Sequence, residues 1–326
     1  MKQTRMMALG MLLAVVTPCL AFAGNLSDVI QVGNNVLATT DQVGADNTAT
    51  VNQYGDYLKA DVDQLGDTNT ATVDQGNAGT PANSSQLVGY VSGAVIYQEG
   101  DRNMASTTWH VGNQGSRITQ TGDDNSGTQD LSAHEGYSAG KFAIDIQQVG
   151  NNNLGTQVTT YKYGTYGIQD MLLQQTGNNN SGTQTSLSGK SIGMEIIQTG
   201  NDNISTQLQD GMQDVASAKM VGSFNTTEQV QAYTVWGLTN RSAVIDIVGS
   251  NNFASQTQLG IATVADITMV GDRNSAVQNQ VGDNNFAKLT QVGNDNIATQ
   301  TQSGAWNSST VSQTGNFNNV AVTQSN

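Results

Sequence analysis

The chain has 326 residues and a formal net charge of −14, with 6% aromatic residues, two prolines and one cysteine. This acidic balance disfavours nucleic acid as a partner, because binding phosphate requires a basic face. The only cysteine, Cys19, lies in the leader described next, so the remaining chain has no thiol for a disulfide or a metal. Such a polar composition is also found in disordered chains, but the regular spacing described below indicates ordered repeats.

Residues 1–23 have the features of a secretory signal peptide. Lys2 and Arg5 give a positive start, residues 6–16 are mostly apolar, and residues 21–23 read Ala-Phe-Ala, which fits a cleavage site. The apolar stretch is too short to span a bilayer, and no later stretch is long and apolar enough to do so. We therefore expect a secreted chain without a transmembrane segment.

Residues 24–75 contain repeats of eleven residues. Each repeat has Gln, then Gly two places on and, in its full form, Asn five places on. Gly and Asn both tolerate positive φ, so together they predict a tight turn, and the stretch between turns suits a short strand. Val36 and Leu58 replace the Asn in alternate units, which makes a double unit of 22 residues the better repeat.

Each predicted strand has one inward face. Four positions of each repeat share one parity and therefore face the same side. They are the Asn, the small residue two places on, the aliphatic or amide residue two places after that one, and the next Gln. Identical amides stacked at strand spacing hydrogen-bond from one strand to the next, which satisfies buried polar groups. We expect an all-β fold, a β-solenoid or cross-β stack of strand-turn-strand repeats with two facing parallel sheets and about nine double units.

The rhythm changes twice farther along the chain. Residues 76–97 contain Pro81 and lack the spacing, so we expect an irregular insertion there. In residues 98–279 the double unit widens to between 22 and 28 residues, but one turn of each unit keeps its Gly and Asn, so insertions should collect at the opposite turn. Residues 280–326 return to tight eleven-residue repeats. Both outer faces are expected to be polar and acidic, with residues such as Asp145, Glu195, Asp246 and Asp266.

Two sets of residues follow from this spacing as the candidate structural site. The expected turn glycines are Gly44, Gly66, Gly100, Gly122, Gly150, Gly177, Gly200, Gly222, Gly249, Gly271, Gly282, Gly293, Gly304 and Gly315. The expected amide ladder consists of Gln42, Asn47, Gln53, Gln64, Asn69, Gln75, Gln148, Asn153, Gln175, Asn180, Gln198, Asn203, Gln280, Asn285, Gln291, Asn296, Gln302, Asn307, Gln313 and Asn318.

The repeat resembles the curlin repeat of bacterial curli subunits, most clearly in residues 42–53, 64–75 and 280–291. The resemblance covers most of the chain after the leader and is interrupted at residues 76–93. It implies a functional amyloid: a structural subunit that polymerises into extracellular curli-like fibres, a fimbrium or pilus of the cell surface, for cell adhesion and biofilm matrix. It also implies a fellow subunit or nucleator and an outer-membrane secretion pore as partners, and it leaves open whether this chain is a major subunit or a nucleator.

The residues independently favour polymerisation. Soluble solenoids cover their ends with polar capping units, because an end strand has unpaired backbone groups. Residues 319–324 form an uncharged final strand without a visible cap. An uncovered end accepts another copy of the chain, and the outward acids then act as gatekeepers that delay association.

Several other functions are weighed against this one. We expect no enzyme, cofactor or metal site, because His110 and His134 are the only histidines and no catalytic arrangement accompanies them. The acidic turn strings lack calcium-loop spacing, so we interpret them as turn formers. Trp109, Trp236 and Trp306 are expected to pack in loops rather than to bind sugars. The alternative function is a soluble secreted β-solenoid adhesin, or a ligand-binding repeat protein that binds ice or glycans.

Overall fold

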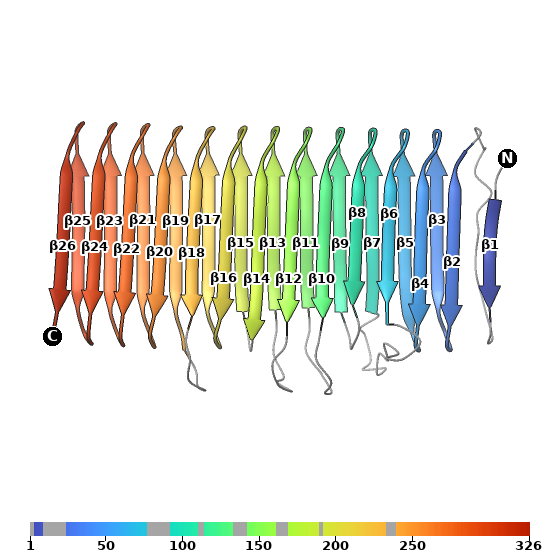
Figure 1. The fold of residues 1–326 in the computed structure, drawn as a ribbon, viewed down its shortest axis with the longest axis horizontal. Helices are drawn as coiled ribbons and strands as arrows, with labels where there is room; N and C mark the ends of the chain where they lie inside the picture. The colour runs from blue at the N-terminus through green and yellow to red at the C-terminus, as the bar shows by residue number, and fades with distance from the viewer. Residues whose placement is uncertain are drawn as a thin grey trace. The chain divides into compact units, whose positions relative to one another are not determined.

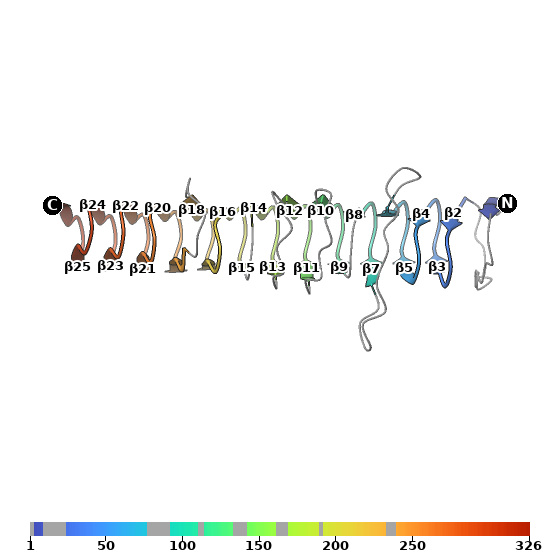
Figure 2. The ribbon, with the colours of Figure 1, turned by 90° about the horizontal axis from the view of Figure 1, so that it is seen from below.

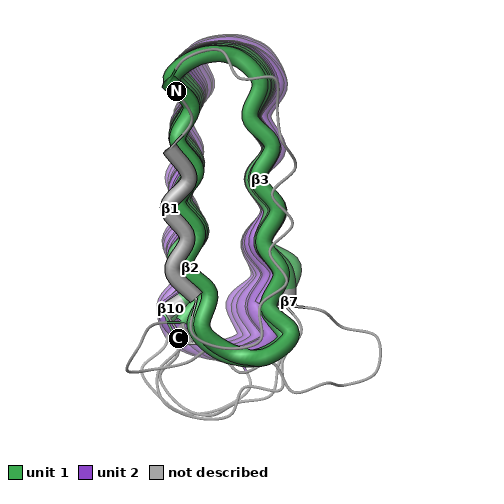
Figure 3. The backbone as a smooth tube through the Cα atoms, turned by 90° about the vertical axis from the view of Figure 1, so that its right-hand side faces the viewer, with its two compact units in different colours: residues 1–169 green, residues 170–326 purple. Residues whose placement is uncertain are grey.

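The fold is built entirely from strands in the part of the chain that the structure describes. A computed structural model describes residues 3–8, 24–76, 92–109, 114–132, 142–160, 169–188, 192–232 and 239–326. These residues form no helix, so none of them belongs to a helix long and apolar enough to cross a membrane. The chain divides into two compact units, residues 1–169 and 170–326 (Figure 3).

Unit 1 consists of two parallel sheets that face each other. The even-numbered strands form one sheet, in the order β1-β2-β4-β6-β8-β10-β12, and the odd-numbered strands form the other, in the order β3-β5-β7-β9-β11 (Figure 1). The strands are β1 (Gln3–Ala8), β2 (Leu26–Val32), β3 (Leu37–Val43), β4 (Thr48–Tyr54), β5 (Leu58–Leu65), β6 (Thr70–Gln75), β7 (Ser92–Glu99), β8 (Met104–Trp109), β9 (Gln114–Thr121), β10 (Ser126–Ser132), β11 (Phe142–Val149) and β12 (Leu154–Thr160).

Unit 2 repeats this arrangement, with the even strands in the order β14 to β26 and the odd strands from β13 to β25; Figure 2 shows the two rows edge-on. The prediction of an all-β solenoid with two parallel sheets is therefore confirmed in each unit. The strands are β13 (Gln169–Thr176), β14 (Ser181–Ser188), β15 (Ile192–Thr199), β16 (Ile204–Asp210), β17 (Val215–Val221), β18 (Thr226–Ala232), β19 (Ser242–Val248), β20 (Phe253–Leu259), β21 (Val264–Val270), β22 (Ser275–Val281), β23 (Phe286–Val292), β24 (Ile297–Ser303), β25 (Ser308–Thr314) and β26 (Asn319–Ser325).

The repeat number exceeds the expected nine double units. The described strands from β3 onward form five odd-even pairs in unit 1 and seven in unit 2. One further pair arises because β7 begins at Ser92, inside the range 76–97 that was expected to be irregular. Ala94, Ile96 and Gln98 alternate with outward residues as in the other strands, so this segment pairs with β5 in register. Residues 77–91 lie outside the described part.

Two kinds of turn alternate along each unit. We call the turn from an odd strand to the next even strand the fixed turn, and the turn from an even to the next odd strand the variable turn. Between residues 24 and 326, every gap in the described residues follows an even strand and therefore falls at the variable turn. The insertions expected at this turn therefore lie largely outside the described residues.

The fixed turn depends on glycine for a steric reason. Gly44 has φ of 119°, and a Cβ atom placed on it would lie 2.0 Å from the carbonyl oxygen of Gly66 in the next repeat. The tight turn lies where the Gly and Asn predict it, and its positive φ besides that of Gly44 is taken by Asp46, the residue before Asn47, with φ of 56°. The Asn47 side chain is needed instead as a cap: its Nδ2 donates to the carbonyl oxygen of Gly66 over 2.7 Å.

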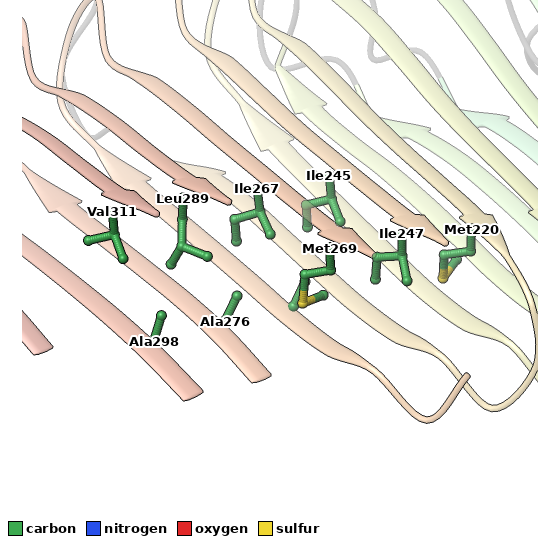
Figure 4. Packing of buried hydrophobic residues seen from close by; sticks show 10 residues of the cluster. Met220, Ile245, Ile247, Ile267, Met269, Ala276, Leu289, Ala298 and Val311 are labelled. Carbon is green, nitrogen blue, oxygen red and sulfur yellow. The ribbon is translucent and has the colours of Figure 1, made fainter. Parts of the chain in front are cut away.

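The interior is a narrow layer between the sheets, where alternate residues of each strand are buried. In β4, for example, Ala49, Val51 and Gln53 are fully buried and pair in register with Ala71, Val73 and Gln75 of β6. In unit 2 the layer includes a more apolar section, in which aliphatic and methionine side chains project between the sheets (Figure 4). Its members are Met220, Ile245, Ile247, Ala254, Ile267, Met269, Ala276, Leu289, Ala298 and Val311.

One buried ion pair in unit 2 has no counterpart in the predicted repeat. Asp214 and Arg241 have fully buried side chains, and they occupy successive positions of the column that holds Asn285 and Asn307 farther along the unit. Arg241 Nη2 donates to Asp214 Oδ2 over 2.6 Å and to the carbonyl oxygen of Asp210 over 2.9 Å. The Arg241 backbone amide also donates to Asp214 Oδ1, over 3.0 Å.

This ion pair is located where the chain returns from residues 233–238, which lie outside the described part. Thr239 Oγ1 lies 2.7 Å from Asp214 Oδ1 and 2.7 Å from the carbonyl oxygen of Met212. Gly211 leaves the necessary space, because a Cβ atom there would lie 2.2 Å from Arg241 Nη2. The pair therefore holds β19 in register with β17 after a connection longer than the basic repeat.

We expect replacement of either charged partner to destabilise unit 2 strongly. Asp214→Leu or Arg241→Leu leaves one buried charge without its counterion, which lowers the free energy of unfolding by about 3–5 kcal/mol. The double substitution removes both charges and should recover most of this loss. Denaturant unfolding followed by circular dichroism measures all three variants.

The exposed ion pair between Arg273 and Asp295 provides the matched control. Arg273→Leu should have a much smaller effect, because water solvates both of these groups. Equal losses for Arg241→Leu and Arg273→Leu would contradict the interpretation.

Candidate functional site

Stacked glutamine side chains form three ladders in the interior. We call them the odd ladder, at the last inward position of the odd strands, the even ladder, at the same position of the even strands, and the central ladder, two residues earlier in the even strands. Within each run, Nε2 of one Gln donates to Oε1 of the next over 2.6–3.1 Å. The odd ladder contains Gln42, Gln64, Gln98, Gln120 and Gln148 in unit 1, then Gln175 with Gln198 and Gln291 with Gln313 in unit 2.

The other two ladders lie in the even-numbered sheet. Burial of an amide is costly unless both its donors and its acceptor find partners, and these runs provide partners along the stack. The even ladder contains Gln31, Gln53 and Gln75 in unit 1 and Gln209, Gln231, Gln258, Gln280, Gln302 and Gln324 in unit 2. The central ladder contains Gln129 and Gln157, then Gln184, Gln207, Gln229, Gln256, Gln278 and Gln300.

The second N–H of these amides crosses the interior. Gln280 Nε2 donates to the carbonyl oxygen of Val264 over 2.9 Å, and Gln278 Nε2 donates to that of Asp266 over 3.0 Å. Both acceptors belong to β21, in the facing sheet. Each such glutamine therefore connects neighbouring repeats and also connects the two sheets.

The ladders have a direction. Every Gln–Gln bond described above runs from Nε2 of the lower-numbered residue to Oε1 of the higher-numbered one. The first members of four runs, Gln31, Gln129, Gln209 and Gln291, have a buried Oε1 with no hydrogen-bond partner among the described residues. These four runs thus begin with an unused acceptor, and each can continue at its other end through an amide N–H.

Asparagines form a further ladder along the fixed turn. The backbone N of Asn69 donates to Asn47 Oδ1 over 2.9 Å, while Asn69 Nδ2 donates to the carbonyl oxygen of Gly100 over 2.7 Å. The Asn69 side chain thus satisfies two backbone groups of the following repeat, the carbonyl oxygen of Gly100 and the N–H of Asn103. Two of the expected asparagines, Asn285 and Asn307, pair with each other at the variable turn. The others lie at the fixed turn: Asn47, Asn69 and Asn153 in unit 1 and Asn180, Asn203, Asn296 and Asn318 in unit 2.

All fourteen expected turn glycines have φ between 96° and 134°. Gln209, Gln231 and Gln258 belong to the even ladder but were not among its predicted members. They could have been found by stepping back from Gln280 one double unit at a time, through 22, 27 and 22 residues. The buried pair of Asp214 and Arg241 could not be predicted from the repeat, because neither residue recurs at the equivalent position of other repeats.

Apolar residues interrupt two of the glutamine columns. Between Gln198 and Gln291 the odd column holds Met220, Ile247 and Met269, which pair in register. In unit 1 the even column continues from Gln75 to Trp109 and then to Leu131. Amide and apolar residues therefore alternate as blocks along the stack, not residue by residue.

The aromatic and histidine candidates differ in location. Trp109 is fully buried between the sheets, so it packs in the interior and not in a loop as expected, because its column is continuous with Gln75. Trp306 is 77% exposed. His110, His134 and Trp236 lie outside the described residues. Within the described ranges, no group of three or more His, Cys, Asp or Glu side chains is arranged to hold a metal ion.

The acidic residues of the fixed turn cap the backbone of the preceding repeat. Asp67 Oδ1 accepts from the backbone N of Ala45 over 2.7 Å, and Asp101 Oδ1 accepts from that of Asp67 over 2.8 Å. Asp123 does the same for Asp101 over 2.9 Å. These carboxylates are therefore used as turn-forming groups, which matches the interpretation of the turn strings.

Asp63 and Asp246, on the outer faces of the odd-numbered strands, lie where their ionised form is disfavoured. Burial raises the pKa of the Asp63 carboxyl, and Asp61 and Asp41 raise it further. Burial also raises the pKa of Asp246; Lys219 partly offsets this effect, whereas Asp266 and Glu195 add to it. At neutral pH both carboxylates oppose the stacked state, as expected for residues that delay association.

Interior amides should contribute far more to stability than outward ones. Gln278→Leu removes the partners of Gln256 Nε2 and Gln300 Oε1, and each buried polar atom left unpaired costs about 1–3 kcal/mol. The adjacent Asn279→Leu, on the outer face, is the matched control and should change the free energy of unfolding much less. Equal effects in denaturant unfolding would contradict a stabilising role for the ladder.

The pH dependence of stability should differ in sign between two aspartates. Because the folded pKa of Asp246 lies above its ordinary value of 3.8, Asp246 favours the folded state fully below 3.8 and loses that contribution as pH rises through the folded pKa. Asp246→Asn should therefore stabilise the protein at neutral pH, and this gain should shrink on acidification. Denaturant unfolding at neutral and acidic pH measures it.

Asp295 provides the opposite case. The hydrogen bond from Arg273 lowers the pKa of Asp295 below 3.8, so its contribution is present above 3.8 and is lost as pH falls through the folded pKa. Asp295→Asn should weaken the fold slightly at neutral pH and have no effect in strong acid. The same sign for Asp246→Asn and Asp295→Asn would refute this assignment.

Comparison with known proteins agrees with the repeat pattern. No curated protein matches the chain. Residues 293–325 match the curlin associated repeat, which confirms the resemblance to curlin repeats in this segment. Together with the repetitive solenoid, this match indicates a structural protein.

Proposed function

We propose that the chain is a secreted structural subunit that polymerises end to end into extracellular curli-like amyloid fibres for adhesion and biofilm matrix, without catalysis or a cofactor. The observation that carries this proposal is the direction of the glutamine ladders. Unit 1 begins with an unused acceptor, Gln31 Oε1, and the ladders of unit 2 end at the amide donors of Gln313 and Gln324, so these two ends are complementary when a second copy adds in the same orientation. Such a head-to-tail contact does not close on itself, so it generates a filament.

The last repeat supports the proposal. β26 pairs with β24 and is the last strand of its sheet order, as β25 is in the other sheet. Gln324 accepts from Gln302 and donates to the carbonyl oxygen of Ser308 over 2.9 Å, so Gln324 Nε2 retains an N–H directed along the stack. Gln31 Oε1, the unused acceptor at the start of the even ladder, would accept it in the next copy.

Export and cleavage of residues 1–23 belong to the same proposal. The backbone of β1 pairs with β2, from Gln3 with Leu26 to Ala8 with Gln31. Removal of the leader would therefore leave β2 as the edge strand that a second copy needs. The curlin match supports a cell-surface fibre as the location, with a nucleating or fellow subunit and an outer-membrane secretion pore as further partners.

Incubation of the purified chain, with and without residues 1–23, tests the function. The proposal expects fibres with a meridional reflection near 4.7–4.8 Å, which elongate from added seeds and form faster without the leader. A chain that stays monomeric for days under both conditions would refute polymerisation. It would favour the soluble adhesin or ligand-binding solenoid instead.

Substitution at the last repeat tests the proposed contact. Gln313→Leu with Gln324→Leu removes both amide donors. Each buried hydrogen bond lost costs about 1–3 kcal/mol, so loss of the two corresponds to at least roughly thirtyfold weaker addition at the fibre end. Thr314→Leu with Ser325→Leu places the same side chains at adjacent outward positions as a control. Seeded elongation should slow only in the first variant; equal slowing in both would contradict end-to-end addition through the ladders.

A further inference from the structure

The two outer faces of unit 2 carry very different charge. On the odd-numbered sheet each strand from β13 to β23 has one outward charged residue, namely Asp170, Glu195, Lys219, Asp246, Asp266 and Lys288. On the even-numbered sheet, β20, β22, β24 and β26 have none. The expectation that both outer faces are acidic is therefore wrong for this part of the chain. We call the outer face of these four strands the uncharged face.

The composition of the uncharged face favours sheet-to-sheet contact. Its strands lie side by side in register (Figure 1) and lack Pro and Gly, so they present an unbroken surface. The outward residues are hydroxyl, amide and aliphatic side chains and one aromatic side chain, that of Phe253; Phe253, Val281 and Ile297 are between 39% and 50% exposed. Uncharged strands of this kind form dry interfaces between stacked sheets.

The distribution of charge on unit 2 indicates that the partner of the uncharged face is a second copy of the chain. On the odd face of unit 2, Lys219 and Lys288 pair with Glu195 and Asp266, which leaves Asp170 and Asp246 as excess negative charge. The whole chain is also acidic, with a net charge of −14, so two copies repel each other there. The uncharged face is the part of unit 2 where two copies approach without opposing like charges. A second copy also has the same spacing between strands, so its side chains can interdigitate in every repeat.

We propose that the uncharged face binds the same face of a second copy, so that two stacks associate laterally, about 10 Å apart, within one fibre. This inference rests on the proposed function, because it concerns copies that already lie in a stack. Four strands of seven residues cover roughly 440 Å² at ordinary strand dimensions. That is about half of the ~800 Å² per partner that a stable pair of proteins buries.

The small area has a consequence for when the contact forms. Two isolated copies lack enough surface to stay together, but a fibre presents the face again with every added copy, and linked contacts reinforce one another. Lateral association therefore follows stacking and does not precede it. Single chains remain monomeric until a fibre exists.

The test introduces charge on one face at a time. Thr257→Asp with Thr301→Asp adds two carboxylates to the uncharged face, on β20 and β24. Thr268→Asp with Ser312→Asp adds the same groups to the odd face at the same strand position and with the same two-strand spacing, on β21 and β25. Thr257→Val with Thr301→Val controls for loss of the hydroxyls. Mass per length and filament number per fibre are measured by electron microscopy, and seeded elongation by dye fluorescence.

Wild-type fibres and the odd-face and valine variants should contain paired stacks, with about twice the mass per length of the variant charged on the uncharged face. That variant should form single stacks that still elongate from seeds. Wild-type fibres that are already single stacks would overturn the inference, as would pairing that survives Thr257→Asp with Thr301→Asp or is lost equally in the odd-face variant. Absence of any wild-type fibre would instead refute the proposed function.

Discussion

The structure depends on one constraint: a buried side-chain amide must use its donors and its acceptor. Much of the interior between the two facing sheets is Gln and Asn. Gln280 meets the constraint by accepting from Gln258, donating to Gln302 and donating across the layer to the carbonyl oxygen of Val264. The same bonds that satisfy the amide hold neighbouring repeats in register and the two sheets together.

This constraint also explains where the amides are absent. Met220, Ile247 and Met269 replace glutamine in successive odd strands, where their side chains pack with Ile245 and Ile267 (Figure 4). A single apolar residue within a ladder would leave an unpaired amide on each side, whereas a block of three leaves only the two at its boundaries. Gln291 Oε1, at one such boundary, is buried and has no partner among the described residues. Interrupting a ladder in blocks keeps these costs few.

Near-identical repeats create a second problem, because any repeat could pair with the wrong neighbour. The ladders alone do not prevent a shift by a whole unit, since glutamine meets glutamine in each register. Asp214 and Arg241 differ from this pattern: they are fully buried, occupy one position each and satisfy each other only when β17 pairs with β19. A buried ion pair adds little net stability, but it gives this part of unit 2 a register that the repeat itself does not specify.

The sequence by itself determined the repeat length, the strand parity, the turn glycines and the inward amides, because these depend on local spacing: Gly44, Asn47 and Gln53 occupy their positions relative to one another in a single half-unit. Tertiary structure alone decided the features that depend on residues from different repeats. These include the positive φ of Asp46 in place of Asn47, the burial of Trp109, the partnership of Asp214 with Arg241, and the separation of charge between two outer faces. The physical reason is that spacing specifies which face of a strand a residue occupies, but only the assembled stack determines which residue lies beside it.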